Sequence, residues 1–312
     1  MFWGEKRYHS LDYHLKKIYG FKVQKISLDA GMTCPTRDGT KGTRGCIFCS
    51  AKGSGDFTTG RCGSITGQID EAILNMSPNK KCGGKYIAYF QSFTNTYAPT
   101  EYLRELFYEA VSHEKIAGIS IATRPDCLSP ETMVLLCELQ KIKPVWVELG
   151  LQTIHENTAK FIRRGYTLDV FDQAVAELSE KSIDIIVHVI LGLPHETRDD
   201  MLGTIDYIAK SSVSGIKLQL LHVLKNTDLA DYYGTFHILS EDEYTELVVD
   251  CLERLPEDMV IHRLTGDGPS NLLIAPLWSL KKRSVLNSIN RKLKEKNTWQ
   301  GRLYSPAIRD TL

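Results

Sequence analysis

The chain has 312 residues, of which 42% are hydrophobic and 24% charged, and its 38 Lys and Arg residues balance 38 Asp and Glu residues. This is the composition of a globular protein with a sizeable core, and zero net charge gives no general argument for a nucleic-acid partner without a local basic patch. No apolar run reaches the roughly 18 residues of a membrane span, and residues 1–7 lack the apolar core of a signal peptide. We therefore expect a cytoplasmic protein whose eight cysteines are thiols or metal ligands rather than disulfides.

Short runs rich in β-branched residues alternate with amphipathic helical patterns along the chain. We expect strands at Val23–Leu28, Tyr86–Gln91, Gly118–Thr123, Val145–Leu151, Asp184–Leu191, Gly215–Val223 and Met259–Leu264. We expect helices at Glu101–His113, Glu131–Gln140, Leu168–Lys181, Arg198–Lys210 and Glu241–Leu255. Such alternation predicts an α/β fold with a parallel sheet, and six or seven units favour a partial (β/α)6 barrel with active groups at the C-terminal strand ends. A doubly wound open sheet is the alternative.

The chain divides into three predicted parts. Residues 1–20 form an N-terminal extension, residues 21–270 the barrel, and residues 271–312 a C-terminal extension. The last part contains a predicted helix from about Leu280 to Lys296 with many basic residues, among them Lys292 and Lys294. A basic terminal helix can bind phosphates or simply present a solvated face.

Three cysteines lie in a glycine-rich segment directly after the first expected strand, at Cys34, Cys46 and Cys49. Thiolates are the usual ligands of iron–sulfur clusters, and glycines let a loop bend around a metal. Three ligands leave one iron of a 4Fe–4S cubane open, whereas structural zinc usually takes four. A cluster is the favoured interpretation, with a Cys–His zinc site or unliganded thiols as alternatives. The other cysteines show no paired spacing and predict no auxiliary cluster: Cys62, Cys82, Cys127, Cys137 and Cys251.

The pattern Cys34-x11-Cys46-x2-Cys49 resembles that of the radical S-adenosylmethionine (SAM) superfamily, whose usual spacing is Cys-x3-Cys-x2-Cys. The longer first gap is similar to that of a smaller branch, the YhcC/YtqA-type proteins, which are related to the radical SAM core of the Elongator catalytic subunit. Four further segments carry this resemblance, which covers nearly the whole chain: Lys6–His9, Gly53–Phe57, Tyr89–Tyr97 and Thr265–Pro269.

The resemblance implies an enzyme in which Cys34, Cys46 and Cys49 hold a 4Fe–4S cluster and SAM binds the open iron. An electron from a flavodoxin- or ferredoxin-type donor then cleaves SAM, and the resulting 5′-deoxyadenosyl radical abstracts a substrate hydrogen. The protein supplies binding, orientation and exclusion of water.

The resemblance also implies where SAM binds. In the superfamily, a Gly-Gly-Glu-like motif after the second strand accepts hydrogen bonds from the SAM amino group. This chain lacks that motif and has four polar residues there, which are either neutral acceptors for the amino group or a plain polar turn: Gln91, Ser92, Thr94 and Asn95. Gln152 would bind the ribose hydroxyls, and Glu148 shares its strand face or belongs to a buried ion pair. Arg164 would pair with the SAM carboxylate.

Two more strand ends are candidates for the SAM site. Gly192 would let the backbone approach the adenine, and Leu193 would pack on it. Arg124 either faces the active site or makes a structural salt bridge. Nearby, His188 is interpreted as a core histidine.

The substrate is expected at the last strand and the basic helix, through His262, Arg263, Asp267, Lys292 and Lys294. The branch resemblance implies tRNA, with a carboxymethylaminomethyl group on C5 of the wobble uridine converted to aminomethyl. Two alternatives stay open: a radical SAM enzyme acting on a small molecule or a protein, and a non-catalytic adaptor that binds zinc or a cluster.

Overall fold

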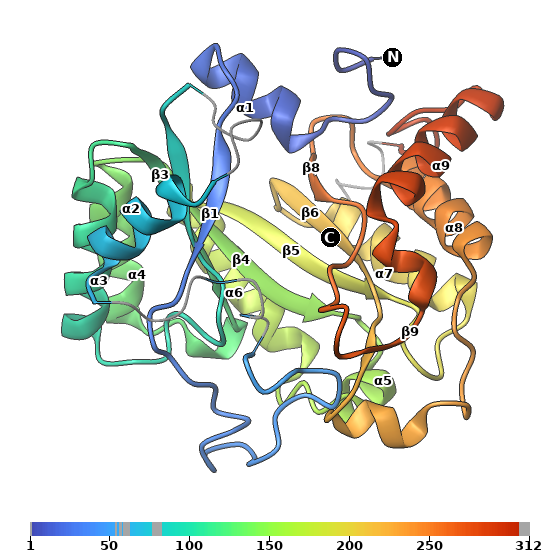
Figure 1. Ribbon diagram of the computed structural model, residues 1–312, viewed down its shortest axis with the longest axis horizontal. Helices are drawn as coiled ribbons and strands as arrows, with labels where there is room; N and C mark the ends of the chain where they lie inside the picture. The colour runs from blue at the N-terminus through green and yellow to red at the C-terminus, as the bar shows by residue number, and fades with distance from the viewer. Residues whose placement is uncertain (1, 54, 56–57, 59–62, 77–82, 306–312) are drawn as a thin grey trace.

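Seven strands form one curled parallel sheet whose strand order follows the chain order (Figure 1). The computed structural model describes residues 2–53, 55, 58, 63–76 and 83–305. A doubly wound sheet would reverse its strand order midway, whereas consecutive neighbours wind into a barrel. The predicted partial barrel is therefore confirmed. Its strands are β1 (Gln24–Leu28), β2 (Tyr86–Phe90), β3 (Ile116–Thr123), β4 (Val145–Gln152), β5 (Asp184–Leu191), β6 (Gly215–Leu220) and β8 (Val260–Arg263).

The expected strand over residues 215–223 divides into two elements. The sheet strand β6 ends at Leu220, and β7 (Val223–Leu224) pairs antiparallel with β9 (Leu273–Ala275) outside the main sheet. The loop from β8 to β9 thereby reaches the C-terminal end of the barrel, where Asp267 and Pro269 line the central cavity.

Helices cover the convex side of the sheet (Figure 1). A parallel sheet must be covered in this way because both of its faces are apolar; Phe90 of β2, for example, packs edge-on against Phe107 with 5.0 Å between ring centroids. Two covering helices begin with complete capping boxes, at Thr197 and at Ser240. The helices are α2 (Ile65–Leu74), α3 (Thr100–Ser112), α4 (Pro130–Gln140), α5 (Glu156–Phe161), α6 (Leu168–Glu180), α7 (Arg198–Lys210), α8 (Glu241–Arg254) and α9 (Lys282–Glu295).

The N-terminal extension contains a helix that the sequence patterns did not predict, α1 (Leu11–Tyr19), which lies across the N-terminal end of the barrel (Figure 1). Its Leu15 is 2% exposed and packs in one apolar cluster with residues of the strands, including Ile87, Trp146 and Ile186. The Tyr19 hydroxyl also donates a hydrogen bond to the Ala117 carbonyl (3.3 Å). This helix therefore closes that end of the barrel.

The barrel interior changes character from one end to the other. Alternate residues of a strand face the same side, so each inward position sits two residues from the next. Trp146 of β4 and Ile186 of β5 lie in the apolar cluster beside α1. Two residues further toward the C-terminal ends of these strands, Glu148 and His188 line the cavity. An apolar floor thus supports a layer of polar and charged side chains.

The basic C-terminal helix packs on an acidic neighbour. Lys292 of α9 donates hydrogen bonds to Asp242 (2.7 Å) and Glu246 (3.0 Å) of α8, and Lys296 also pairs with Glu246. Part of the basic surface expected over residues 280–296 is thereby neutralised within the fold. Among the helices of the described residues, none combines the length and the apolar character needed to cross a bilayer.

Candidate active site

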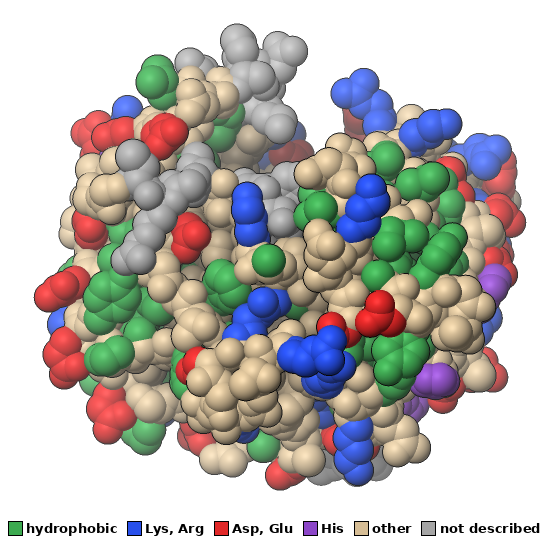
Figure 2. Space-filling model, turned by 60° about the horizontal axis from the view of Figure 1, so that its bottom comes forward, with side chains coloured by type: hydrophobic (Ala, Val, Ile, Leu, Met, Phe, Trp, Pro, Cys, Tyr) green, Lys and Arg blue, Asp and Glu red, His purple; other side chains and the backbone are tan. Residues whose placement is uncertain are grey.

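The C-terminal ends of the strands surround a cavity of about 710 Å³, on the face shown in Figure 2. Lys and Arg side chains gather near the middle of that face. Cys34, Cys46 and Cys49 all line this cavity, together with side chains from strands β1 to β6 and from the loop after β8. The three cysteines predicted to act together therefore line one cavity at the mouth of the barrel.

The loop that carries these cysteines is held by its own backbone and by one arginine. The Gly45 amide donates to the Thr36 carbonyl (2.8 Å), and Arg37 donates to the carbonyls of Cys49 (3.1 Å) and Ser50 (2.7 Å). Gly45 has a φ of 72°, and a Cβ there would lie 2.8 Å from the Arg37 guanidinium. Glycine is thus required for the close turn that the loop makes beside Arg37.

All three cysteines are reduced thiols of intermediate burial. Burial raises the pKa of Cys46 to about 12, the neighbouring Cys49 and Cys34 add to the effect, and Arg124 and Arg37 oppose it. Within the described ranges, no three His, Cys, Asp or Glu side chains converge on a position for a single metal ion; a cubane cluster places its thiolates on separate irons.

The other described cysteines, Cys127, Cys137 and Cys251, do not line this cavity. Cys251 is fully buried in the core, and burial raises its pKa to about 12. Cys127 and Cys137 are free thiols of intermediate burial. Cys62 and Cys82 lie outside the described residues.

The four polar residues predicted after β2 divide between the cavity and the protein interior, because Ser92 and Asn95 are buried and do not line the cavity. Gln91 and Thr94 line the cavity, and Ser27 donates to the Gln91 side chain (3.0 Å). The side-chain amide nitrogen of Asn95 donates hydrogen bonds to the carbonyls of Phe90 (3.1 Å) and Ala122 (2.8 Å). Within the described part of the chain, the Asn95 side-chain oxygen and the hydroxyl of Ser92 are buried without a hydrogen-bond partner.

Gln152 at the end of β4 combines an unusual backbone with an unused acceptor. Its φ is 71°, a left-handed conformation that non-glycine residues seldom adopt. Its side chain lines the cavity, and its amide oxygen is buried without a partner among the described residues. A buried acceptor of this kind is costly unless a ligand donates to it, so Gln152 is suited to a hydroxyl group.

Two arginines lie behind the cysteine loop and are largely occupied by the protein. Arg124 makes a bidentate pair with Asp126 (2.9 and 2.8 Å) and donates to the Arg164 carbonyl (2.7 Å). Arg164 is 2% exposed and donates to three backbone carbonyls and to Glu156 (2.8 Å). Both arginines line the cavity. For Arg124 the sequence left a structural salt bridge and a position facing the active site as alternatives, and the structure contains both.

The candidate adenine contacts lie beside this cavity. Gly192 has a φ of 89°, and a Cβ at this position would lie 3.2 Å from Leu239. Leu193 is buried in an apolar cluster with Ile190 and Leu221. Ile190 and Leu221 themselves line the cavity, so this cluster forms its apolar wall.

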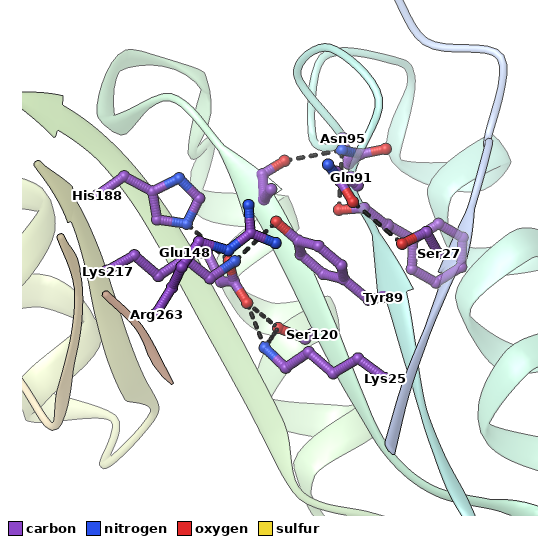
Figure 3. Close-up of polar contacts among 12 residues, drawn as sticks. Lys25, Ser27, Tyr89, Gln91, Asn95, Ser120, Glu148, His188, Lys217 and Arg263 are labelled. Carbon is purple, nitrogen blue, oxygen red and sulfur yellow. Dashed lines mark hydrogen bonds and ion pairs between the residues drawn. The ribbon is translucent and has the colours of Figure 1, made fainter. Parts of the chain in front are cut away.

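Halfway down the barrel lies a group that we call the charged layer (Figure 3). Glu148 is at its centre and is 1% exposed. Its Oε1 accepts from Lys25 and Ser120 (2.6 Å), and its Oε2 accepts from Lys217 and His188 (2.6 Å). The ion-pair alternative for Glu148 is therefore what the structure contains. The charged layer comprises Lys25, Tyr89, Ser120, Glu148, His188 and Lys217.

The electrostatics of this layer are uneven. Burial alone would raise the pKa of Glu148, but Lys217 and Lys25 outweigh burial and hold that pKa well below its usual value. Burial lowers the pKa of Lys217 to about 7, since Glu148 offsets the loss of water only partly and Lys25 and Arg263 add repulsion. Burial, with Lys217, also lowers the pKa of His188 to about 4. The layer thus has more cationic groups than its single carboxylate satisfies.

The substrate candidates of the last strand divide between the cavity and the core. Arg263 and Asp267 line the cavity and lie 3.4 Å apart, and Lys282 pairs with Asp267 (2.7 Å). His262 lies against Gly215, where an added Cβ would come within 2.8 Å of its ring. Lys294 is exposed on α9, away from the cavity lining.

Sequence reasoning did not identify Lys25, Tyr89, Ser120 and Lys217 as site residues. A usable signal was present, because a lysine inside an apolar parallel strand must find a counterion. Lys217 stands between Ile216 and Leu218 in such a strand. Only the curvature of the sheet, however, brings β1, β4 and β6 to one point.

The rim outside the cysteine loop carries additional basic residues. Arg44 (2.5 Å) and Arg163 both pair with Asp228, so two cations share one carboxylate. Lys41 pairs with Asp126 (2.6 Å), which also forms an ion pair with Arg124. This rim therefore keeps a positive charge excess.

Comparison with known proteins identifies relatives of this chain. It is 47% identical to protein YtqA of Bacillus subtilis over 96% of this chain and 94% of that protein. It is 25% identical to the tRNA uridine(34) acetyltransferase of Methanocaldococcus jannaschii over 61% of this chain and 34% of that protein. The solved structure of archaeal Methanocaldococcus infernus Elp3 superimposes with a TM-score of 0.63 at 17% identity, covering 76% of this chain and 59% of that one, and shares the fold.

Two sequence families match the chain along most of its length. The radical SAM superfamily matches residues 39–208, and the radical SAM C-terminal domain matches residues 213–295. The first match runs from Gly39, inside the cysteine loop, into α7, and the second runs from just before β6 to the end of α9. Together with the close likeness to YtqA, these matches show that the chain belongs to the radical SAM superfamily of enzymes.

Proposed function

We propose that Cys34, Cys46 and Cys49 hold the 4Fe–4S cluster of this radical SAM enzyme, and that the neighbouring strand ends hold SAM. The family binds both cofactors, and the donor set suits them, since three thiols face one cavity and leave a fourth coordination position to a ligand. When bound, the cluster and SAM supply a 5′-deoxyadenosyl radical that abstracts hydrogen. This convergence of three thiols on one cavity is the observation that carries the proposal.

The residues around the cysteine loop divide the work of binding SAM. Gln152 accepts a hydrogen bond from a ribose hydroxyl through its unpartnered amide oxygen, and Gln91 and Thr94 face the amino group. Arg124 brings positive charge to the carboxylate end while Asp126 keeps it in place. The apolar wall that includes Ile190 and Leu221 excludes water from the reacting atoms.

We infer that the substrate is tRNA, and that the enzyme removes the carboxymethyl unit from a carboxymethylaminomethyl group on C5 of the wobble uridine, with SAM as the oxidant. Abstraction of one hydrogen from the carboxymethyl carbon, and loss of a proton and of one electron that replaces the electron used to cleave SAM, would give an imine. Water would then hydrolyse the imine to the aminomethyl group and glyoxylate. A related protein is named for a reaction on tRNA uridine 34, and the positive rim of Arg44, Arg163 and Lys41 suits a phosphate backbone. The electron donor is a flavodoxin- or ferredoxin-type protein.

Two measurements test this function. Holoenzyme reconstituted without oxygen should contain iron, absorb near 400 nm and release 5′-deoxyadenosine with a reductant; Cys46→Ala should lose all three, whereas the control Cys137→Ala should keep them. Nucleoside mass spectrometry of tRNA from a deletion strain should show carboxymethylaminomethyluridine accumulating. Zinc in place of iron would refute the cofactor proposal, and unchanged tRNA nucleosides would refute the substrate.

A further inference from the structure

The charged layer shares its cavity with the cysteine loop but has no evident role in holding the cluster or SAM. Among the described residues that line this cavity, cationic side chains outnumber acidic ones by seven to two. Asp126 and Glu156 neutralise Arg124 and Arg164 from outside the lining. The other five cations still exceed the two acids, and such an excess in a low-dielectric cavity favours an anionic ligand. The cations are Lys25, Arg37, Arg124, Arg164, Lys217, Arg263 and Lys282, and the acids are Glu148 and Asp267.

The two lysines of the layer each have a donor to spare. Lys217 donates to Glu148 and to the Tyr89 hydroxyl (3.0 Å), and Lys25 donates to Glu148 and to Ser120 (3.0 Å). Since an ammonium group has three protons, one remains on each lysine. Glu148 holds both ammonium groups in place, and the ring of Tyr89 lies beside them, with its centroid 4.4 Å from the Lys217 nitrogen.

Arg263 stands next to Lys217 and is the least occupied cation of the group. It is the register partner of Lys217 across β6 and β8, and Figure 3 shows its guanidinium turned toward the charged layer. Its ion pair with Asp267 is long, at 3.4 Å, and Asp267 is held closer by Lys282, at 2.7 and 2.9 Å. Among the described residues, most of the five donors of the guanidinium therefore have no partner and can bind a ligand.

We propose that Arg263, supported by Lys217 and Lys25, forms a subsite for a carboxylate of the substrate. A planar fork of N–H donors matches the two oxygens of a carboxylate. The subsite lies inside the barrel, where an extended side chain can reach it more readily than a backbone phosphate. This inference rests on the proposed function, since the carboxymethylaminomethyl group ends in a carboxylate and the aminomethyl product does not.

The first test compares tRNA anticodon arms that carry the carboxymethylaminomethyl or the aminomethyl group. Wild-type holoenzyme with SAM should bind the carboxylated arm more tightly. Arg263→Gln should raise its KM by at least about tenfold, and Arg263→Lys should restore part of the loss because it keeps the charge. Arg198→Gln is the matched control, since Arg198 pairs with Asp250 on the outside of the barrel, and its KM should equal that of the wild type.

The second test uses small probes and does not depend on tRNA. N-methylglycine contains the carboxymethylamino group alone, and methylamine lacks the carboxylate. Saturation-transfer NMR on the holoenzyme with SAM should detect N-methylglycine but not methylamine, and Arg263→Gln should abolish the signal while Arg198→Gln keeps it. Equal signals for the two probes would overturn the subsite.

The outcomes separate this inference from the proposed function. If N-methylglycine binds through Arg263 while no tRNA is converted, the tRNA function is wrong and the subsite stands. If tRNA is converted but Arg263→Gln keeps the wild-type KM, the subsite is wrong. If Arg263→Gln weakens SAM binding as much as substrate binding, the anion is the SAM carboxylate and the subsite for substrate is overturned.

Discussion

The substitution Glu148→Gln tests whether the charged layer depends on its single carboxylate. Glutamine has the same shape but no charge, and it would leave Lys217, whose side chain is 5% exposed, and Lys25 without their anionic partner. Removing one member of a buried ion pair typically costs about 3–5 kcal/mol. We expect a loss of that size in the free energy of unfolding at pH 7, and a fall in Tm of about 6 °C or more.

The pH dependence of this loss follows from Lys217. Its pKa in the folded protein is about 7, below its usual value of 10.5, so the unfolded chain binds more protons between those pH values. This group therefore makes the protein more stable as pH rises through that range. Above pH 7 Lys217 loses its proton and needs Glu148 less, so the penalty of Glu148→Gln should be smaller at pH 9 than at pH 7.

Thermal unfolding followed by circular dichroism, under identical anaerobic conditions at the two pH values, measures this effect. Glu138→Gln is the control, because Glu138 pairs with Arg104 on the surface between α3 and α4, and its Tm should change far less. Adding Lys217→Met to Glu148→Gln should recover part of the loss, since the buried cation is removed with its partner. An unchanged Tm for Glu148→Gln at pH 7 would refute the reasoning.

Two further predictions concern the ends of the chain. Leu15→Ala should lower the free energy of unfolding, measured by urea denaturation, by about 2–5 kcal/mol. The control Leu74→Ala changes a side chain that is 76% exposed and should alter this free energy little. Equal effects of the two substitutions would contradict the closure of the barrel by α1. Lys292→Glu should lower the Tm because it places a carboxylate beside two acidic residues of α8. Lys294 has no ion pair among the described residues, so Lys294→Glu should preserve the Tm and weaken tRNA binding at low salt. Identical melting of the two variants would contradict this placement.

Much of the barrel was predictable because its strands have strong local patterns. Strand β5 has the predicted bounds, Asp184–Leu191, because its β-branched run ends before Gly192. Helix α7 has the predicted bounds, Arg198–Lys210, because a capping box begins at Thr197. Helix α1 was not predicted, although Leu11, Leu15 and Tyr19 have helical spacing between a Ser10 cap and Gly20. A nine-residue helix is too short to be stable alone, and its packing on the end of the barrel stabilises it.

The candidate site was predictable in part for a similar reason. The cysteines are close in sequence, so their spacing alone predicted a common ligand, and their shared cavity agrees with that prediction. The charged layer depends instead on contacts such as that of Lys25 with Glu148, which are 123 residues apart. No local pattern contains that pairing, although the charge of Glu148 in an apolar strand indicated that some partner had to exist.

The closure of the barrel by α1 has a kinetic consequence. With the N-terminal end closed, the proposed cofactor and substrate sites share the cavity at the opposite end, where the cysteine loop stands. A macromolecule resting on that rim covers any small molecule deeper inside. Under the proposed function with tRNA, the nucleoside and methionine formed from SAM would leave only after the tRNA product, so dissociation of tRNA would set the rate at which the enzyme takes up new SAM.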